Sequence, residues 1–411
     1  MPRSGILDVE RHGSLARTNG TRVDGAQNSG APHGRTTRWD RISPVQHTPH
    51  STITTWRANL ILVLASVLSL TAVLLTIELG LRRWDPTYLV RTRGVHVYST
   101  VYGWAPRHNV SAVIDGHHLT LNALGHRGRD LGPKQPGQKR VVVIGDSVAY
   151  GLDVSDEETF AQILDTRRNG LEVTNLAVQG YGTGQQLVKL EREGLPLHPD
   201  VVLLAYCENN DLADTLSPSF LYNERVPKPH FELTASGLHL REAHLRMGVL
   251  RWWSTWLLDH SQLFHRAVAI IQPREAGTLH LLHGGPDEKV HWTERKARLL
   301  EREEAGLRLT AALIERMQAD AKAENGQLVL AVFPGRAAYR NGSRITRRLG
   351  EIANANGIVF VDLAQALRGA ATNYRAFAED KLGHLSPQGH RLVADVLEPI
   401  LIEASQEHHG P

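Results

Sequence analysis

Residues 140–151 read Arg-Val-Val-Val-Ile-Gly-Asp-Ser-Val-Ala-Tyr-Gly, and this stretch decides the fold of the 411-residue chain. Its apolar run, Val141 to Ile144, is long enough for a strand and too short for a helix. An unbroken run of this kind is typical of a central strand covered on both faces. Because the run stops at Gly145-Asp146, Ser147 follows the carboxyl end of a buried strand, where open α/β sheets bind ligands. Ser147 is therefore either a turn residue or a nucleophile.

Strand and helix patterns alternate on both sides of this stretch. We expect strands over 141–144, 171–176, 201–206, 328–333 and 358–361, and helices over 159–168, 185–193, 345–355 and 387–404. Ser155 is predicted to cap the helix 159–168, and Thr293 to cap a long helix that ends at Asn325-Gly326. Residues 98–130 are expected to extend the sheet. This alternation predicts an α/β fold with a parallel sheet and helices on both faces.

Residues 212–292 interrupt the alternation. The segment is rich in His and Leu, contains Trp252, Trp253, Trp256 and Trp292, and is expected to lack strands. Residues 246–260 fit an amphipathic helix. Two interpretations stay open, a packed insertion and a lid or wall of a substrate site.

Residues 58–77 form a twenty-residue stretch without a formal charge. As a helix it would be ~30 Å long, the thickness of a bilayer's hydrocarbon core. Trp56 and Trp84 flank it as interfacial aromatics do. A buried core helix would be apolar on one face only, and a cleaved signal peptide would not follow a 57-residue lead. We therefore expect a disordered tail over 1–55, a single transmembrane helix with its flanks over 56–83, and a folded domain over 84–405.

Charge does not orient this predicted span, since arginines stand on both sides of it. The net charge of +3 is too small to indicate nucleic-acid binding. The single cysteine, Cys207, excludes an intrachain disulfide and a multi-cysteine metal site.

Four short blocks carry candidate chemistry at the ends of successive elements. Ser147 follows the first strand, Gly180 the second and Asn210 the third, and His384 precedes the last helix. In a doubly wound sheet these ends converge on one rim. Cleavage of an ester needs a hydroxyl nucleophile, a base and donors for the oxyanion. We predict Ser147 as nucleophile, His384 as base, and an oxyanion hole formed by the backbone N–H groups of Ser147 and Gly180 and the side-chain amide of Asn210. Gly180 would let the substrate approach the backbone closely.

These blocks resemble the SGNH (GDSL-type) hydrolase superfamily over about residues 100–400, and most closely its membrane-anchored bacterial members. The resemblance implies a flavodoxin-like three-layer α/β/α fold and hydrolysis of O-acyl esters, on glycans or lipids, with no metal and no organic cofactor. It also implies a catalytic domain outside the cytoplasmic membrane.

Two positions depart from the usual pattern of that superfamily. Glu208 replaces a glycine in the third block, and Lys381 stands where an aspartate usually precedes the histidine by three. Asp380, four residues before His384, is predicted as the acid that orients the histidine, with a Ser–His dyad as the alternative. His390 is interpreted as structural and Asp146 as a residue that stabilises the turn.

Three other functions fit parts of the sequence. The same residues suit an O-acyltransferase that modifies a cell-surface polysaccharide, since a sugar hydroxyl can replace water as the acceptor. A non-catalytic glycan-binding protein could retain the fold. The loop Gly180-x-Gly182-x-Gly184 superficially matches a dinucleotide-binding fingerprint, but its third glycine comes one position early.

Overall fold

The computed structural model describes residues 52–167, 170–221, 223–243, 249–271, 298, 301–368, 374–378 and 383–406. Asp380, Thr293 and nearly all of the predicted tail lie outside the described residues. The chain divides into two compact units, Met1–Leu64 and Ala65–Pro411. The elements below belong to the second unit, apart from the first part of the N-terminal helix.

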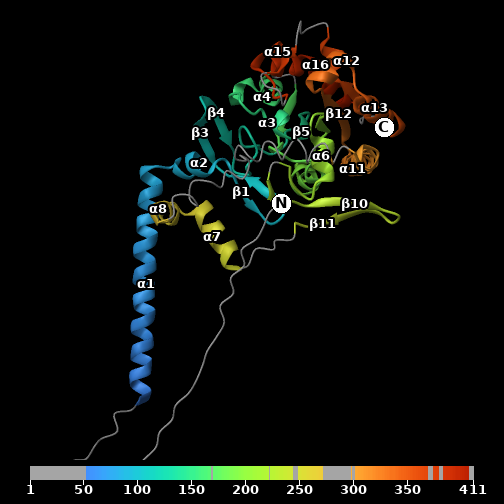
Figure 1. The fold of residues 1–411 in the computed structure, drawn as a ribbon. Coiled ribbons are helices and arrows are strands. Elements are labelled where there is room, and N and C mark those ends of the chain that lie inside the picture. The colour runs from blue at the N-terminus through green and yellow to red at the C-terminus, as the bar shows by residue number, and fades with distance from the viewer. Residues whose placement is uncertain are drawn as a thin grey trace, which may run out of the picture. The chain divides into compact units, whose positions relative to one another are not determined.

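The core of this unit is a five-stranded parallel sheet (Figure 1). Its strands are β5 (Lys139–Gly145), β6 (Leu171–Asn175), β7 (Val201–Cys207), β12 (Gln327–Phe333) and β13 (Val359–Asp362). The spatial order is β13-β12-β7-β5-β6. Numbered along the chain, this order is 2-1-3-4-5, the flavodoxin-like arrangement. The predicted fold class is confirmed, and the strand predictions differ from the structure by one or two residues.

Helices cover both faces because successive strand side chains point to opposite sides. Val141 and Val143 enter one apolar core, and Val142 and Ile144 enter the other. The first face carries α3 (Ser147–Tyr150), α4 (Phe160–Thr166), α14 (Leu363–Leu367), α15 (Tyr374–Phe377) and α16 (Pro387–Gln406). The second face carries α5 (Thr183–Lys189), α11 (Glu303–Ala323) and α13 (Arg344–Ala355). The short helices α6 (Asp211–Leu216) and α12 (Arg336–Asn341) follow β7 and β12.

Three helix starts differ from the sequence prediction. The long helix α11 begins at Glu303 after Arg302 and not at a cap by Thr293, because residues 301–302 form a turn. Ser155 caps a short 3₁₀ turn, Asp156–Glu158, instead of α4. The hydroxyl of Thr159 then caps α4 by accepting from the Gln162 N–H. Helix α5 begins two residues early at Thr183 and continues as a π-helical turn, Leu190–Gly194, and a 3₁₀ turn, Leu195–Leu197.

The prediction that residues 212–292 lack strands was wrong. The segment forms two antiparallel hairpins, β8–β9 (Ser219–Phe220, Asn223–Pro227) and β10–β11 (His230–Thr234, Gly237–Arg241), and then α7 (Val249–His260) and α8 (Gln262–Ile271). Phe231 and Leu233 alternate with polar residues, so the period-2 signal was present but short. Phe220 and Val226 are buried against Trp104 and Tyr181. This part of the segment is therefore a packed insertion.

Residues 96–121 form two further hairpins, β1–β2 (His96–Ser99, Gly103–Pro106) and β3–β4 (Val110–Ile114, His117–Leu121), after the short helix α2 (Tyr88–Arg93). The β3–β4 hairpin connects to the main sheet through two isolated antiparallel bridges, from Leu121 to Arg127 and from Arg127 to Asn175 of edge strand β6.

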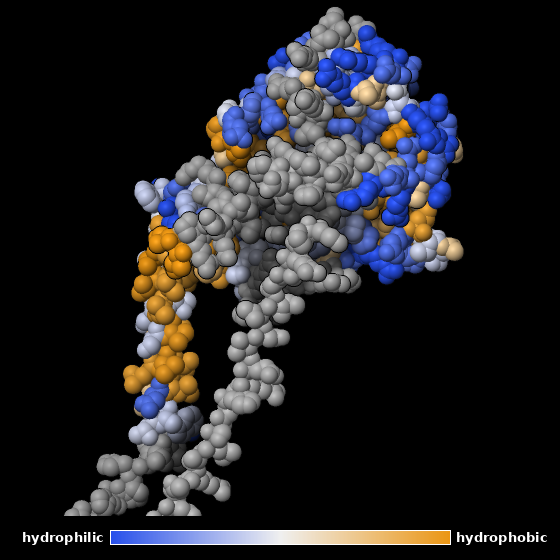
Figure 2. Space-filling model, viewed as in Figure 1, coloured by the Kyte–Doolittle hydropathy of each residue, from blue (hydrophilic) through white to orange (hydrophobic). Residues whose placement is uncertain are grey.

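The N-terminal helix α1 runs from Thr52 to Trp84. Within it, Thr55–Trp84 is long and apolar enough to cross a membrane, and none of its most apolar window is buried. Figure 2 shows apolar residues on the surface of this helix along most of its length. The predicted transmembrane helix is thus a plausible one by length and composition.

Candidate active site

Ser147 is the first residue of α3, directly after the carboxyl end of β5. The Asp146 carboxylate caps this helix by accepting a hydrogen bond from the Val148 N–H at 2.9 Å, as expected for a residue that stabilises the turn. A Cβ on Gly145 would lie 2.7 Å from the Ala149 side chain, so the tight strand-to-helix turn requires glycine. The turn leaves the Ser147 side chain partly exposed at the sheet edge.

The His384 imidazole meets this hydroxyl from the other end of the chain. His384 Nε2 lies 3.0 Å from Ser147 Oγ, across 237 positions of sequence. The loop that carries His384 is fixed at its C-terminal end, where it enters α16. There Ser386 Oγ accepts a hydrogen bond from the Gly389 N–H at 2.9 Å. A distance of 3.0 Å is suitable for direct proton transfer between a hydroxyl and an imidazole.

A carboxylate also approaches the other imidazole nitrogen. Asp153 Oδ2 lies 3.8 Å from His384 Nδ1, which is an ion-pair distance and too long for a hydrogen bond. Asp153 is half exposed and has a left-handed backbone with φ of 64°. The sequence reasoning missed it, because a loop aspartate six residues after the serine carries no pattern. Asp380, the predicted acid, lies outside the described residues.

Gly180 adopts a left-handed φ of 74° in the loop after β6. A Cβ at this position would lie 2.5 Å from the ring of Phe220, which belongs to the insertion. The glycine is therefore required by its backbone conformation and by Phe220, a different physical reason from the predicted approach of substrate. Among the described residues, no hydrogen-bond acceptor is paired with the backbone N–H of Gly180 or of Ser147.

Asn210, just before α6, points its amide nitrogen at two carboxylates. Its Nδ2 donates to Asp146 Oδ2 and to Asp214 Oδ2, each at 3.0 Å. This contact brings Asn210 beside the residue that precedes Ser147. Any oxyanion would share the two hydrogens of Nδ2 with these acceptors.

The same edge buries several acidic groups. Desolvation raises the pKa of Asp146, and hydrogen bonds from Val148 and Asn210 partly oppose it. Desolvation, and then the charge of Asp146, raise the pKa of Asp211 well above its ordinary value. Burial also raises the pKa of Glu208 to about 7. Strongly shifted carboxyl groups of this kind are typical of functional sites.

His390 lies apart from the chemistry. Its ring is fully buried, stacks on Phe160 and accepts a hydrogen bond from the Phe160 N–H at 3.1 Å. Burial lowers its pKa to about 3, so the imidazole is neutral and suited to a structural role.

No group of three or more potential metal-ligating side chains occurs in the part of the chain that the structure describes. A cavity of about 480 Å³ lies between α6, β10 and α11, and is lined by residues that include Thr215, Phe231 and Arg308. None of the predicted site residues lines this cavity.

A serine–histidine pair at the carboxyl edge of a parallel sheet is the arrangement that α/β serine hydrolases use. The family can also be stated. The model of the GDSL-like Lipase/Acylhydrolase family matches residues 143–392, more than half of the chain, and the chain belongs to this family. It is thus a hydrolase that acts on ester bonds.

Solved structures give weaker similarities. One is "Crystal Structure of TesA", with 14% identity, a TM-score of 0.36 and coverage of 65% of this chain and 99% of that one. Esterase EstA from Pseudoalteromonas sp. gives 12% identity, a TM-score of 0.34 and coverage of 65% and 98%. A catalytic mutant of Axe2, an acetylxylan esterase from Geobacillus stearothermophilus, gives 12%, 0.36, and 65% and 96%. A comparison with curated proteins returns no match.

Proposed function

We propose that this protein is a membrane-anchored serine esterase that cleaves O-acyl esters with Ser147 as nucleophile and His384 as base. The observation that carries the proposal is the 3.0 Å separation of Ser147 Oγ and His384 Nε2. Membership of the ester-hydrolysing family supports the same assignment.

The reaction follows from this geometry in two halves. Ser147 Oγ attacks the acyl carbon while His384 Nε2 accepts the hydroxyl proton. The tetrahedral oxyanion is held by the backbone N–H groups of Ser147 and Gly180 and by the Asn210 amide. Collapse breaks the ester C–O bond, and His384 returns the proton to the leaving alcohol. Water then attacks the acyl-serine with His384 as base, which releases the acid and restores Ser147.

Two carboxylates are candidates for stabilising the imidazolium that forms. Asp380 keeps the place that the family pattern gives to the acid, displaced by one residue. Asp153 is the described carboxylate that faces His384 Nδ1. We assign the orienting role to Asp380 and an auxiliary electrostatic role to Asp153, because an exposed charge at 3.8 Å is strongly screened by water.

The proposed organisation is a tail over 1–55, a membrane span with its flanks over 56–83 and a hydrolase domain over 84–405, which lies outside the cytoplasm. The C-terminal part of α1 makes contacts with the insertion within the second unit. Glu78 accepts hydrogen bonds from the Gln262 N–H at 3.1 Å, the Leu263 N–H at 2.9 Å and the Ser261 hydroxyl at 2.9 Å. The anchor helix thereby caps the N-terminus of α8 in the insertion.

The test is hydrolysis of a short activated ester by the full chain in detergent. Ser147→Ala should lower turnover by about 10,000-fold or more while leaving the melting temperature nearly unchanged. Retained turnover in this variant would refute the assignment. Adding a glycan acceptor to the same assay tests the transferase alternative, which requires the acyl group to appear on the glycan. Protease digestion of intact spheroplasts tests the topology, which predicts cleavage of the hydrolase domain.

A further inference from the structure

The insertion contributes a buried lysine to the interior behind the nucleophile. Lys228 stands between β9 and β10 and is 2% exposed. Its Nζ lies 3.5 Å from Asp214 Oδ1 and makes no hydrogen bond with the described residues. Removing a lysine from water costs several kcal/mol unless a partner compensates. An apolar side chain of similar length would fill the same space at a lower cost in free energy, so the presence of a charged side chain needs an explanation.

The backbone at Lys228 is held in place by its neighbours. The Lys228 N–H donates to the Pro218 carbonyl at 3.1 Å. A Cβ on Gly103 would lie 2.6 Å from the Pro227 carbonyl oxygen and 3.2 Å from Lys228 Cα, so β2 packs directly against this turn. The ammonium group is therefore directed at Asp214 by a rigid segment.

A chain of polar contacts leads from Lys228 to Asp146, the residue before the proposed nucleophile. Lys228 faces Asp214 Oδ1, and the other oxygen of Asp214 accepts from Asn210 Nδ2 at 3.0 Å. The same Nδ2 donates at 3.0 Å to Asp146, the residue before Ser147. These carboxylates, together with Asp211, are at most 1% exposed. Lys228 thus brings a buried positive charge to a buried acidic cluster.

Asp214 and Asp146 together set which way the Asn210 amide faces, because both accept from its Nδ2. An ionised carboxylate only accepts hydrogen bonds, so it selects the amide nitrogen of Asn210 and turns the amide oxygen away. A protonated Asp214 could instead donate to the amide oxygen and favour the flipped amide. The positive charge of Lys228 favours the ionised form, because an opposite charge nearby stabilises a carboxylate.

We propose that Lys228 is a positioning residue of the ester-cleaving site, which holds Asp214 ionised and so keeps the amide nitrogen of Asn210 at the edge where the oxyanion forms. This inference rests on the proposed function, since it gives a purpose to the Asn210 donor. It also assigns a role to the insertion, which supplies both Lys228 and the Phe220 ring packed on Gly180.

The experiment compares turnover of a short activated ester by the full chain in detergent, with the concentration of active sites titrated by a fluorophosphonate. Lys228→Met keeps the length of the side chain and removes the charge. Since loss of a whole oxyanion donor costs ~100- to 1000-fold, we expect a drop in kcat of about 10- to 100-fold, with KM changed less than about threefold. The double variant Lys228→Met/Asp214→Asn removes both charges and retains an oxygen acceptor for Asn210, so kcat should recover to within about fivefold of wild type.

Three results would overturn the role of Lys228. The first is a wild-type kcat in Lys228→Met. The second is a kcat in the double variant that is as low as in Lys228→Met, without recovery. The third is a Lys228→Met variant that loses melting temperature and keeps its kcat. Should Lys228→Met fail to fold, Asp214→Ala decides, because it removes the acceptor that Lys228 supports and should lower kcat by the same factor. Ser147→Ala separates this inference from the proposed function. If wild type and Ser147→Ala are equally active, the proposed function fails, whereas an inactive Ser147→Ala beside a fully active Lys228→Met removes only the role of Lys228.

Discussion

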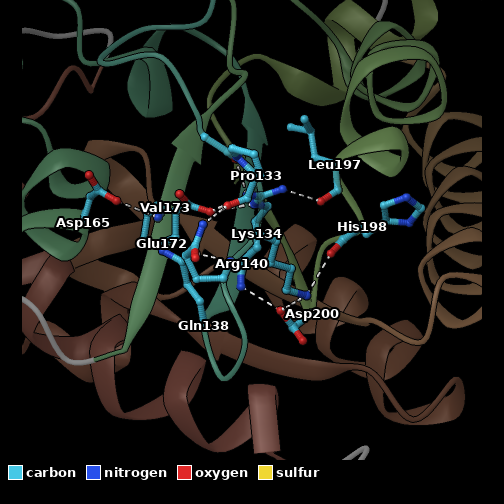
Figure 3. A network of polar contacts seen from close by, with 12 residues as sticks. Pro133, Lys134, Gln138, Arg140, Asp165, Glu172, Val173, Leu197, His198 and Asp200 are labelled. Atoms are coloured by element: carbon cyan, nitrogen blue, oxygen red, sulfur yellow. Dashed lines mark hydrogen bonds and ion pairs between the residues drawn. The ribbon is translucent and has the colours of Figure 1, made fainter.

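The amino and carboxyl edges of the central sheet, where its parallel strands begin and end, differ in how their buried charges are paired. At the amino edge, where β5, β6 and β7 begin, each charge has a close partner (Figure 3). Arg140 lies 2.6 Å from Glu172 with both side chains buried, and Lys134 lies 2.6 Å from Asp200. The Asp200 carboxylate also accepts from the Arg140 N–H at 2.7 Å. These pairs join the strand starts to the segment that precedes β5.

At the carboxyl edge, acidic groups outnumber the described cation nearby. Asp146, Asp211 and Asp214 are buried behind Ser147, and Lys228 faces one of them. Desolvation raises the pKa of Asp146 and Asp211, and this lowers the stability of the folded state when the carboxyl groups are ionised. A sheet edge with a purely structural role has no need for this cost. Paired charge therefore marks the structural edge of this sheet, and clustered acidic charge marks the edge that carries the proposed catalytic residues.

The largest effect is expected at His384. His384→Ala removes the proposed proton acceptor of Ser147, so kcat for a short ester should fall by about 10,000-fold, while unfolding by urea changes little. Steady-state kinetics on the full chain measures it. A kcat within tenfold of wild type would mean that the carboxyl edge is not the reacting edge.

At the amino edge the expected effect is on stability alone. Arg140→Met leaves the buried Glu172 with only its longer contact to Arg129, at 3.5 Å, and should destabilise the fold by up to about 3–5 kcal/mol in urea unfolding. Its kcat per titrated active site should equal that of wild type. Lys134→Ala is the matched control, because Lys134 is partly exposed and should cost at most about 1 kcal/mol. A large loss of kcat in Arg140→Met would contradict the claim that the amino edge affects stability alone.

The two candidate acids next to His384 should separate in kinetics. We expect Asp380→Asn to lower kcat by about 100-fold, since it would leave the imidazole unoriented. Asp153→Asn should lower kcat by less than about fivefold, because Asp153 is half exposed. The reverse ranking would transfer the orienting role to Asp153.

The smallest effect concerns pH and Glu208. Its pKa is about 7 in the folded protein, against an ordinary value of 4.5 for a solvated glutamate, so the folded state binds more protons between these values. The stability contribution of Glu208 is therefore greatest below about pH 4.5 and is lost as the pH rises through 7. Glu208→Gln should stabilise the protein by on the order of 1–3 kcal/mol at about pH 8 and by much less at about pH 5. Equal urea midpoints for variant and wild type at both pH values would contradict the burial cost.

The sequence predicted the sheet because its strands are unbroken apolar runs bounded by Gly, Pro and Asp. It also placed Ser147 and His384 on adjacent ends of elements, which the structure brings to 3.0 Å. Their catalytic roles stay predictions until tested. The hairpin β10–β11 was missed because its alternating residues are few and mostly exposed.

Contacts between distant segments could not be read from any local pattern. Nothing near Lys228 in the sequence indicates that it faces Asp214, since the contact depends on how the insertion folds back. Two other contacts also join distant segments, the packing of Phe220 on Gly180 and the approach of Asp153 to His384. Each arises from tertiary packing, whereas periodicity and capping report only local structure.

The most direct test of the central claim is covalent labelling of the full chain with a fluorophosphonate, followed by mapping of the modified residue by mass spectrometry. The account predicts a single adduct on Ser147, absent in Ser147→Ala and formed far more slowly in His384→Ala. An adduct on another residue, or undiminished labelling of His384→Ala, would contradict it.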